Sequence, residues 1–339
     1  MTASGSHTGE THLRTREAGS RPAGGLAHFP VALFSSVMGL GGTALAWRRA
    51  AQAWGLPEWP FLVFLLAALA AFAAVGSLYV AKWVRHGAAA RAELRHPIRL
   101  AFVPTITIAI LILATALSTV ATAVATVLWW IGAVGHLTAT ALVLSAWFGR
   151  ADLLAGHVTP AWFIPIVGNV VTPLAAPAVG SVEVGWFAFG VGMVFWLALL
   201  PLLLQRLLTH DQPLPEKLLP TLAIFIAPPA VAMLSWQSLT QASADPVSHV
   251  LYGSAMFFVL LVLAQVGRLR RIPFAVPYWA YTFPFAAATV AAIAMADAAG
   301  STGYHVIAAV LLTMTTALVL VISTLTVRAA SRGEICVPE

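Results

Sequence analysis

Residues that could carry out chemistry are scarce in this sequence. His136 is the one titratable residue near the centre of a long apolar run, and Asn169 is the only asparagine. Cys336 is the only cysteine, which excludes an internal disulfide. No His-Glu-x-x-His motif and no cluster of metal-ligating residues is present. The sequence therefore predicts no catalytic residue, no metal site and no cofactor, and we do not expect an enzyme.

The polar residues inside the apolar runs each have a structural and a functional interpretation. For His136, a hydrogen bond to a neighbouring helix is favoured over proton transfer. Asn169 lies between Pro165 and Pro173. Its amide either satisfies carbonyl groups that a helix bend frees, or donates to a passing anion. The glycine-rich string at 39–42 follows no strand, so close helix packing is favoured over a phosphate-binding loop.

The elements that position these residues follow from the composition. Hydrophobic residues make up 60% of the 339 residues and charged residues 9%, whereas an ordinary soluble domain is about 25% charged. A soluble protein of this size could not cover its surface with so few charges. The net charge of +6 does not indicate nucleic acid, because the basic residues flank the apolar runs. The predicted fold class is an all-α polytopic membrane protein that lies in a lipid bilayer.

Ten apolar runs are long enough to cross a bilayer, since a spanning helix needs about 20 mostly apolar residues. A transmembrane domain is therefore expected over residues 29–327, after a disordered N-terminal tail at 1–28 and before a short C-terminal tail at 328–339. The ten predicted spans are residues 30–47, 60–81, 101–118, 123–147, 160–180, 184–207, 217–239, 248–267, 275–297 and 304–327.

The basic residues predict the orientation of the chain. With ten spans, 16 of the 18 Lys and Arg residues fall on the side that holds both termini, and only Arg48 and Arg49 fall on the other. Cytoplasmic loops carry the excess of basic residues in membrane proteins. Both termini are therefore expected to be cytoplasmic, in a multi-pass protein of the cytoplasmic membrane.

Prolines recur inside the odd-numbered spans. Pro104, Pro165, Pro228 and Pro284 are separated by 61, 63 and 56 residues, which is one helical hairpin per period, and Pro173 is a second proline of the fifth span. A buried proline bends its helix and frees a carbonyl group, which protein or cavity water must satisfy. The odd-numbered spans are therefore expected to form an inner ring around a polar path, with the even-numbered spans outside.

Polar side chains beside these bends are candidates to line the path. A pore with hydroxyl and amide groups but no carboxylates suits anions, and backbone N–H groups at the starts of broken helices would assist. The candidate residues are Thr105, Asn169, Thr172, Ser235 and Thr282.

Several strings in the sequence resemble the tellurite-resistance/dicarboxylate transporter family, which includes bacterial TehA and the plant slow-type anion channels. They occur in the family's order from the second loop to the ninth span, and the first span agrees more loosely, so the resemblance covers about residues 28–327. The strings are residues 96–105, 162–169 (WFIPIVGN), 189–196, 213–229 and 279–284 (WAYTFP).

This resemblance implies a specific architecture. It implies ten helices in five hairpins with quasi-fivefold symmetry, the odd-numbered helices lining a central pore. It also implies a homotrimer in which each protomer has its own pore. A phenylalanine of the ninth helix blocks the family's pore, and the matching residue is Phe283, next to Pro284. The positions of the prolines alone could not have selected Phe283 among 17 phenylalanines.

The sequence thus predicts an anion channel, or a channel-like transporter, that passes small anions passively. Monovalent inorganic anions, tellurite and C4-dicarboxylates are all candidate substrates. The alternative is a proton-coupled carrier of malate-type C4-dicarboxylates, for which only His136 is placed as a titratable coupling group. An intramembrane enzyme or a scaffold is disfavoured, because no set of nucleophile, base or metal ligands is present.

The predicted orientation can be tested with reporter fusions. Fusions at residues 10 and 335 are both expected to report a cytoplasmic location, because the basic residues are concentrated on the side of the termini. The measurement is the activity of a reporter that folds only in one compartment. Opposite locations for the two ends would require an odd number of spans and would contradict the predicted fold.

Overall fold

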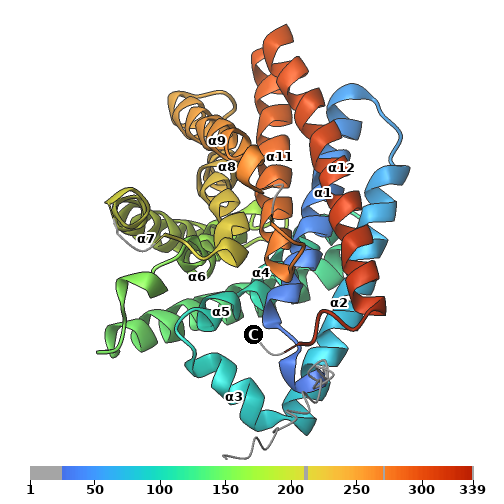
Figure 1. The fold of residues 1–339 in the computed structure, drawn as a ribbon. Coiled ribbons are helices and arrows are strands. Elements are labelled where there is room, and N and C mark those ends of the chain that lie inside the picture. Colours follow the sequence, from blue (N-terminus) through green and yellow to red (C-terminus); the bar gives the residue numbers. More distant parts are fainter. Residues whose placement is uncertain (1–24, 210–212, 270–271, 338–339) are drawn as a thin grey trace, which may run out of the picture.

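The computed structural model describes residues 25–209, 213–269 and 272–337, and within these ranges it contains helices and connecting segments but no strand. Figure 1 shows the helices in chain order. Most of the predicted N-terminal tail, and the basic residues counted there, lie outside the described residues. The described end of that tail forms a short 3-10 turn, Leu26–His28.

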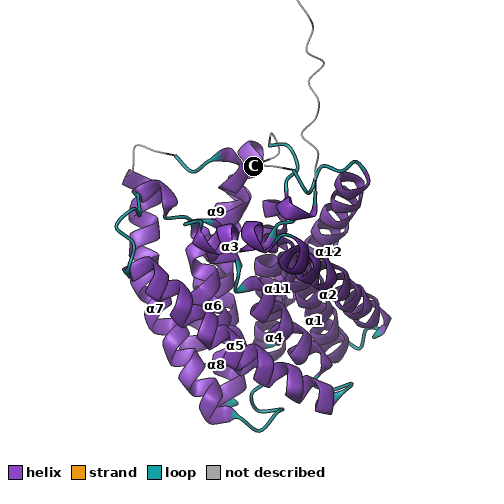
Figure 2. Ribbon diagram, turned by 90° about the horizontal axis from the view of Figure 1, so that it is seen from below, coloured by secondary structure: helices purple, strands orange, loops and turns teal. Residues whose placement is uncertain are grey.

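Long apolar helices cover the outside of the molecule. In the most apolar 18-residue stretch of each helix, only 22% to 39% of the residues are buried inside the protein. Most of their side chains therefore face outward. Apolar side chains that face outward are stable in lipid rather than in water. Figure 2 shows α7 at one edge of the molecule and α2 and α12 at the opposite edge. These outer helices are α2 (Trp59–Arg85), α5 (Thr122–Phe148), α7 (Val182–Thr209), α9 (Pro246–Ala264) and α12 (Thr302–Ser331).

Shorter helices lie inside this layer, each directly after a 3-10 segment. In the most apolar stretches that include α4, α8 and α11, 72% to 78% of the residues are buried, compared with 22% to 39% for the outer helices. The inner helices, each with its preceding 3-10 segment, are α1 (Phe34–Trp54, after Val31–Leu33), α4 (Thr105–Leu117, after Arg99–Phe102), α6 (Ile164–Val171, after Pro160–Phe163), α8 (Ala227–Thr240, after Glu216–Ile226) and α11 (Thr282–Ala299, after Val276–Tyr281).

The recurring prolines lie where each 3-10 segment changes into an α-helix. Pro104 precedes the first residue of α4, and Pro165 and Pro228 are second residues of their helices. Pro284 is the third residue of α11. Proline is tolerated in a first helical turn because its missing N–H would have no partner there. The predicted bends are thus changes of helix type near the start of each inner helix.

Each inner helix packs against the outer helix that follows it in the chain, and the inner helices contact one another in the closed order α1, α4, α6, α8, α11 and back to α1. Two further helices, α3 (Gly87–Arg95) and α10 (Val266–Leu269), lie in connections between hairpins. The predicted division into an inner and an outer layer therefore agrees with the burial and with the contacts.

Eight helices in the described ranges are long and apolar enough to cross a membrane, which shows a polytopic membrane protein but not the ten predicted spans. The predicted first span corresponds to α1, whose serines, glycines and Arg48–Arg49 pair lower its mean hydropathy. The predicted fifth span corresponds to the shorter apolar segment Pro160–Leu174.

The glycine-rich string of α1 allows close contact with α11. A Cβ atom on Gly39 would lie 2.0 Å from Thr282 Oγ1, and one on Gly42 would lie 3.0 Å from Ala286 Cβ and 3.2 Å from Phe283 Cδ2. No side chain larger than hydrogen fits at Gly39 unless the helices separate. The interpretation of this string as a packing surface is confirmed.

A buried ion pair fixes the start of the first inner helix. Lys82 Nζ lies 2.8 Å from Glu93 Oε2 and donates to the carbonyl of Phe29 at 2.8 Å. The other carboxylate oxygen of Glu93 accepts the N–H of Val31 at 3.1 Å, and Tyr79 donates its hydroxyl to the same carboxylate. Lys82 lies directly after the predicted span 60–81, where a basic residue was expected in an exposed loop, whereas the structure buries it, because Glu93 and the chain before α1 supply partners for its charge.

The packing of α1 on α11 predicts the effect of two glycine substitutions. Gly39→Ala is expected to destabilise the protein by about 1–3 kcal/mol, because the added methyl group overpacks the contact with Thr282. Gly76→Ala is the matched control, since nothing lies within 4 Å of the added Cβ on α2. The measurement is thermal unfolding of each purified variant in detergent. Equal melting temperatures for the two variants would contradict the packing role.

Candidate functional site

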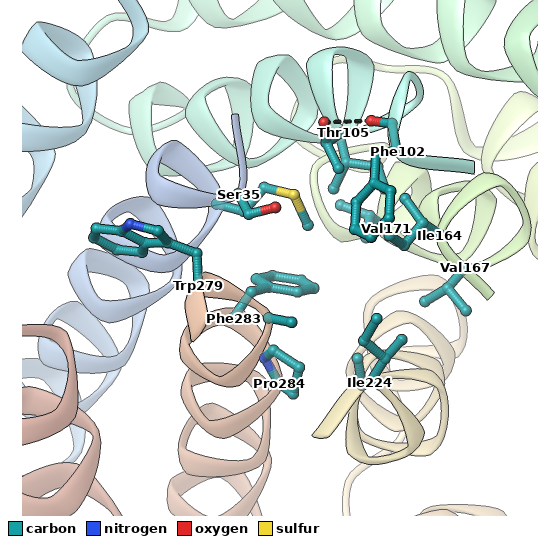
Figure 3. A pocket seen from close by; sticks show the side chains of 14 residues that line it. Ser35, Phe102, Thr105, Ile164, Val167, Val171, Ile224, Trp279, Phe283 and Pro284 are labelled. Carbon is teal, nitrogen blue, oxygen red and sulfur yellow. Dashed lines mark hydrogen bonds between the residues drawn. The ribbon is translucent and has the colours of Figure 1, made fainter. Parts of the chain in front are cut away.

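A small cavity lies at the centre of the ring of inner helices. Its volume is about 40 Å³, room for about three or four water molecules at ~10–15 Å³ each. Every inner segment contributes to its wall (Figure 3). The wall is mostly apolar, whereas the sequence predicted a polar path, because most of the predicted polar side chains hydrogen-bond to groups within the helix packing instead. The lining residues are Ser35, Met38, Phe102, Thr105, Ile108, Ile164, Val167, Val171, Ile224, Ala227, Trp279, Ala280, Phe283 and Pro284.

Phe283 occupies the centre of this site. Its side chain extends from α11 into the space between α1 and the opposite inner helices, where it faces Val167 and Ile224 (Figure 3). Gly42 lies directly behind the ring, which allows α1 to approach it. Pro284 also borders the cavity. The ring is therefore placed across the narrow space that the inner helices enclose.

The wall of the cavity is apolar and carries no charged side chain. Ser35 and Thr105 supply its hydroxyl groups, and Thr105 donates to the carbonyl of Phe102 at 2.6 Å. An ion in this space would lose most of its water and gain few polar contacts, which is energetically expensive. Without a carboxylate in the wall, no fixed negative charge would add repulsion for an anion.

The other predicted polar residues are buried but do not border the cavity. Thr282 Oγ1 donates to the carbonyl of Trp279 at 2.8 Å and faces Gly39. Thr172 and Ser235 donate to the carbonyls of Gly168 and Val170, respectively. Among the candidate side chains, the structure thus brings only Thr105, Phe283 and Pro284 to the cavity wall. Pro104, Pro165, Pro173 and Pro228 lie outside its lining.

Asn169 and His136 meet at one backbone carbonyl of α6. The carbonyl oxygen of Pro165 lies 2.6 Å from Thr140 Oγ1, 3.1 Å from His136 Nε2 and 3.4 Å from Asn169 Nδ2. Asn169 Nδ2 also donates to Thr140 Oγ1 at 2.8 Å and to the carbonyl of Ile166 at 3.2 Å. The amide therefore has partners inside the helix packing, as the structural interpretation of Asn169 expected.

His136 bridges two inner helices from its position on α5. Its Nδ1 lies 2.8 Å from Thr107 Oγ1 of α4, while Nε2 reaches Pro165 of α6. A Cβ on Gly168 would lie 2.1 Å from the ring, so α6 presents a glycine where the imidazole packs. Both ring nitrogens have partners, and the side chain is fully buried. The predicted hydrogen bond to a neighbouring helix is confirmed.

Comparison with known proteins identifies this arrangement. The family described as voltage-dependent anion channel matches residues 28–327, nearly the whole described chain. The chain belongs to the voltage-dependent anion channel family. The resemblance noted from the sequence strings, over about residues 28–327, is confirmed.

Relatives in this family come from plants, archaea and bacteria. The S-type anion channel SLAH3 of Arabidopsis thaliana is 29% identical over 301 residues, 87% of this chain and 47% of the relative. The uncharacterized transporter MJ0762 of Methanocaldococcus jannaschii is 27% identical over 286 residues, 76% of this chain and 82% of the relative. The tellurite resistance protein TehA homolog of Haemophilus influenzae is 24% identical over 258 residues, 76% and 78% of the two chains. The chain spans about half the length of the Arabidopsis channels SLAH3 and SLAH2.

Sequence reasoning missed most of the cavity wall in this family member. Two pairs of lining residues are each spaced three positions apart and face the cavity. They are Ser35 and Met38 on α1, and Ile164 and Val167 on α6. Such spacing places residues on one face of a helix. Apolar side chains at this spacing are indistinguishable in sequence from ordinary packing residues. Ile164 and Val167 lie within two residues of Pro165, whereas no recurring proline marks Ser35 and Met38.

The contacts of His136 predict that it has a structural role. His136→Gln is expected to lose one of two hydrogen bonds, which lowers the free energy of unfolding by about 1 kcal/mol. The pH dependence of anion flux should keep its shape between about pH 5 and 8, where an unperturbed histidine titrates. The measurement is flux into proteoliposomes at several pH values. A flux that loses its response to a pH gradient would instead support a proton-coupled carrier.

Proposed function

We propose that this protein is a passive anion channel whose pore runs through the ring of inner helices and is closed by Phe283. The observation that carries the proposal is the cavity at the ring centre, which every inner segment lines and into which Phe283 projects. The phenyl ring obstructs the path, and the apolar wall makes loss of hydration expensive for an ion. The closed order of contacts among the inner helices supports a continuous path.

The complete pore needs all the inner helices to cross the membrane. In the proposed architecture, α1 and the segment Pro160–Leu174 join the eight long apolar helices as spans, giving ten helices in five hairpins with quasi-fivefold symmetry. The low mean hydropathy of α1 and the short length of Pro160–Leu174 both fit an inner position, where protein rather than lipid surrounds the helix. The protein lies in the cytoplasmic membrane with both termini cytoplasmic, and the transmembrane domain covers residues 29–327.

Small anions are the proposed substrates. The Arabidopsis relatives are named S-type anion channels, and another relative is named a tellurite resistance protein homolog. The wall has no carboxylate that would repel an anion, and we propose small monovalent inorganic anions as substrates, with tellurite and C4-dicarboxylates as further candidates. We also propose a homotrimer in which each protomer contains its own pore, which a mass measurement of the purified protein in detergent can test.

Passive passage is favoured over proton-coupled transport. A coupled carrier requires a group that binds a proton and also responds to the substrate. The cavity wall has no titratable side chain, and His136 lies behind α6 with both ring nitrogens engaged. Anion uptake should therefore persist when the proton gradient is collapsed.

Replacing the gating residue tests the proposal directly. Phe283→Ala is expected to raise anion current per molecule by at least about tenfold, equivalent to lowering the barrier by ~1.4 kcal/mol, because the ring no longer fills the path. The measurement is current across planar bilayers at matched amounts of folded protein.

Phe285→Ala provides the matched control. Phe285 is also a buried phenylalanine of α11, but it does not line the cavity. Its truncation should destabilise the packing, by about 3–5 kcal/mol for a buried phenylalanine, without a gain in current. An unchanged or smaller current for Phe283→Ala, at matched levels of folded protein, would remove Phe283 as the gate.

A further inference from the structure

Accessible surface follows one face of α11 beyond the gate. Between Ala286 and Ala296, the residues that keep any exposed surface are Ala287, Val290 and Ala294, and the others are 0% exposed. These three positions continue the helical face of Phe283 at spacings of three and four residues. The same face reaches Asp297, fourteen residues or about four turns beyond Phe283, where the side chain is exposed.

A matching face runs along α1, the helix that packs against α11. Met38 lines the cavity and Gly42 faces Phe283, while Leu45 and Arg49 are partly exposed. Gly42 and Arg49 are seven residues apart, about two turns, and therefore lie on nearly the same side of the helix. The faces that meet at the gate thus continue to a pair of charged residues at the far end.

Arg49 and Asp297 form an ion pair at this end. Arg49 Nη2 lies 3.0 Å from Asp297 Oδ2, and their side chains are 38% and 50% exposed. The pair joins the ends of α1 and α11, opposite the end at which the chain termini lie. Both side chains are partly exposed, so their charges are accessible from outside the protein.

The neighbouring arginine, Arg48, points away from Asp297 toward other helices. Arg48 donates to the carbonyl of Ala116 at 3.3 Å, and its guanidinium lies 4.9 Å from the ring centre of Phe61. Glu58 is the acidic residue that acts on it electrostatically. Arg48 therefore faces α2 and α4, and Arg49 is the guanidinium on the side of the gate.

We propose that the Arg49–Asp297 ion pair is the charge filter at the mouth of the pore, in which Arg49 attracts the permeating anion and Asp297 limits that attraction. The inference rests on the proposed channel function and adds a determinant of selectivity to it. A fixed charge beside a narrow entrance changes the local concentration of the permeating ion, and salt screens the effect. Asp297 would keep the anion from binding so tightly that it could not leave.

The exposure of the pair makes the inference testable without unfolding the protein. Exposed ion pairs contribute little to stability, so neutral variants should fold. In a Phe283→Ala parent, Asp297→Asn should raise anion current at least about twofold at ~0.01 M salt, where the Debye length is about 30 Å. Arg49→Gln should lower the anion current by a similar factor. In a salt gradient, it should also move the reversal potential toward the equilibrium potential of the cation. At ~1 M salt, both effects should disappear.

Two further variants distinguish a local charge effect from a structural one. Glu183→Gln removes an equal charge from the first turn of the outer helix α7, at the same end of the hairpins, and should leave the current unchanged. The double variant Arg49→Gln, Asp297→Asn should return selectivity close to that of the parent, because its net charge is the same.

The outcomes separate this inference from the channel proposal. Absence of anion current in the Phe283→Ala parent would overturn the proposed function and this inference with it. A parent current that neither Asp297→Asn nor Arg49→Gln changes at low salt would overturn the charge filter alone. A change that persists at high salt, or that Glu183→Gln reproduces, would also overturn it.

Discussion

The structure depends on satisfying backbone polar groups where no water is available. In the hydrocarbon region, a carbonyl group without a partner is so unfavourable that irregular backbone survives only inside protein. The inner helices change from 3-10 to α conformation, and α6 contains only eight residues. Side chains of its neighbours supply donors: His136 and Thr140 reach Pro165, and Trp129 donates to Thr172 at 2.8 Å. Breaks in the inner helices are therefore compatible with a membrane because a second layer surrounds them.

That second layer also explains how the candidate gate is positioned. Phe283 can lie across the cavity because Gly42 leaves room behind it and Pro284 sets the start of its helix. The approach of α1 to α11 at Gly39 holds this arrangement, since no atom of a larger side chain would fit there. Further along the same two helices, Arg49 of α1 pairs with Asp297 of α11, so Phe283 and this ion pair lie along one packing interface.

Charge is concentrated at the ends of the helices and is absent from the cavity wall. The buried Lys82–Glu93 pair lies near the start of α1, and the exposed Arg49–Asp297 pair lies near its end. Removing one member of a buried pair leaves an uncompensated charge, so the first pair is a structural attachment. The second pair is exposed, so removing one of its charges is expected to change the stability of the protein little. The two ion pairs thus attach the start of α1 to α2 and α3, and the later part of α1 to the end of α11.

The sequence determined the membrane class, the alternation of inner and outer helices and the family, because hydropathy, charge asymmetry and proline period are local properties of the chain. It also favoured the packing role of Gly39 and the structural role of His136. Only the tertiary structure decided which residues line the cavity, because Met38, Val167 and their equivalents have the same apolar character as packing residues. It likewise brought Arg49 to Asp297, 248 positions later in the chain. Such a contact depends on the closed order of the inner helices, and no local pattern encodes which helix ends will meet.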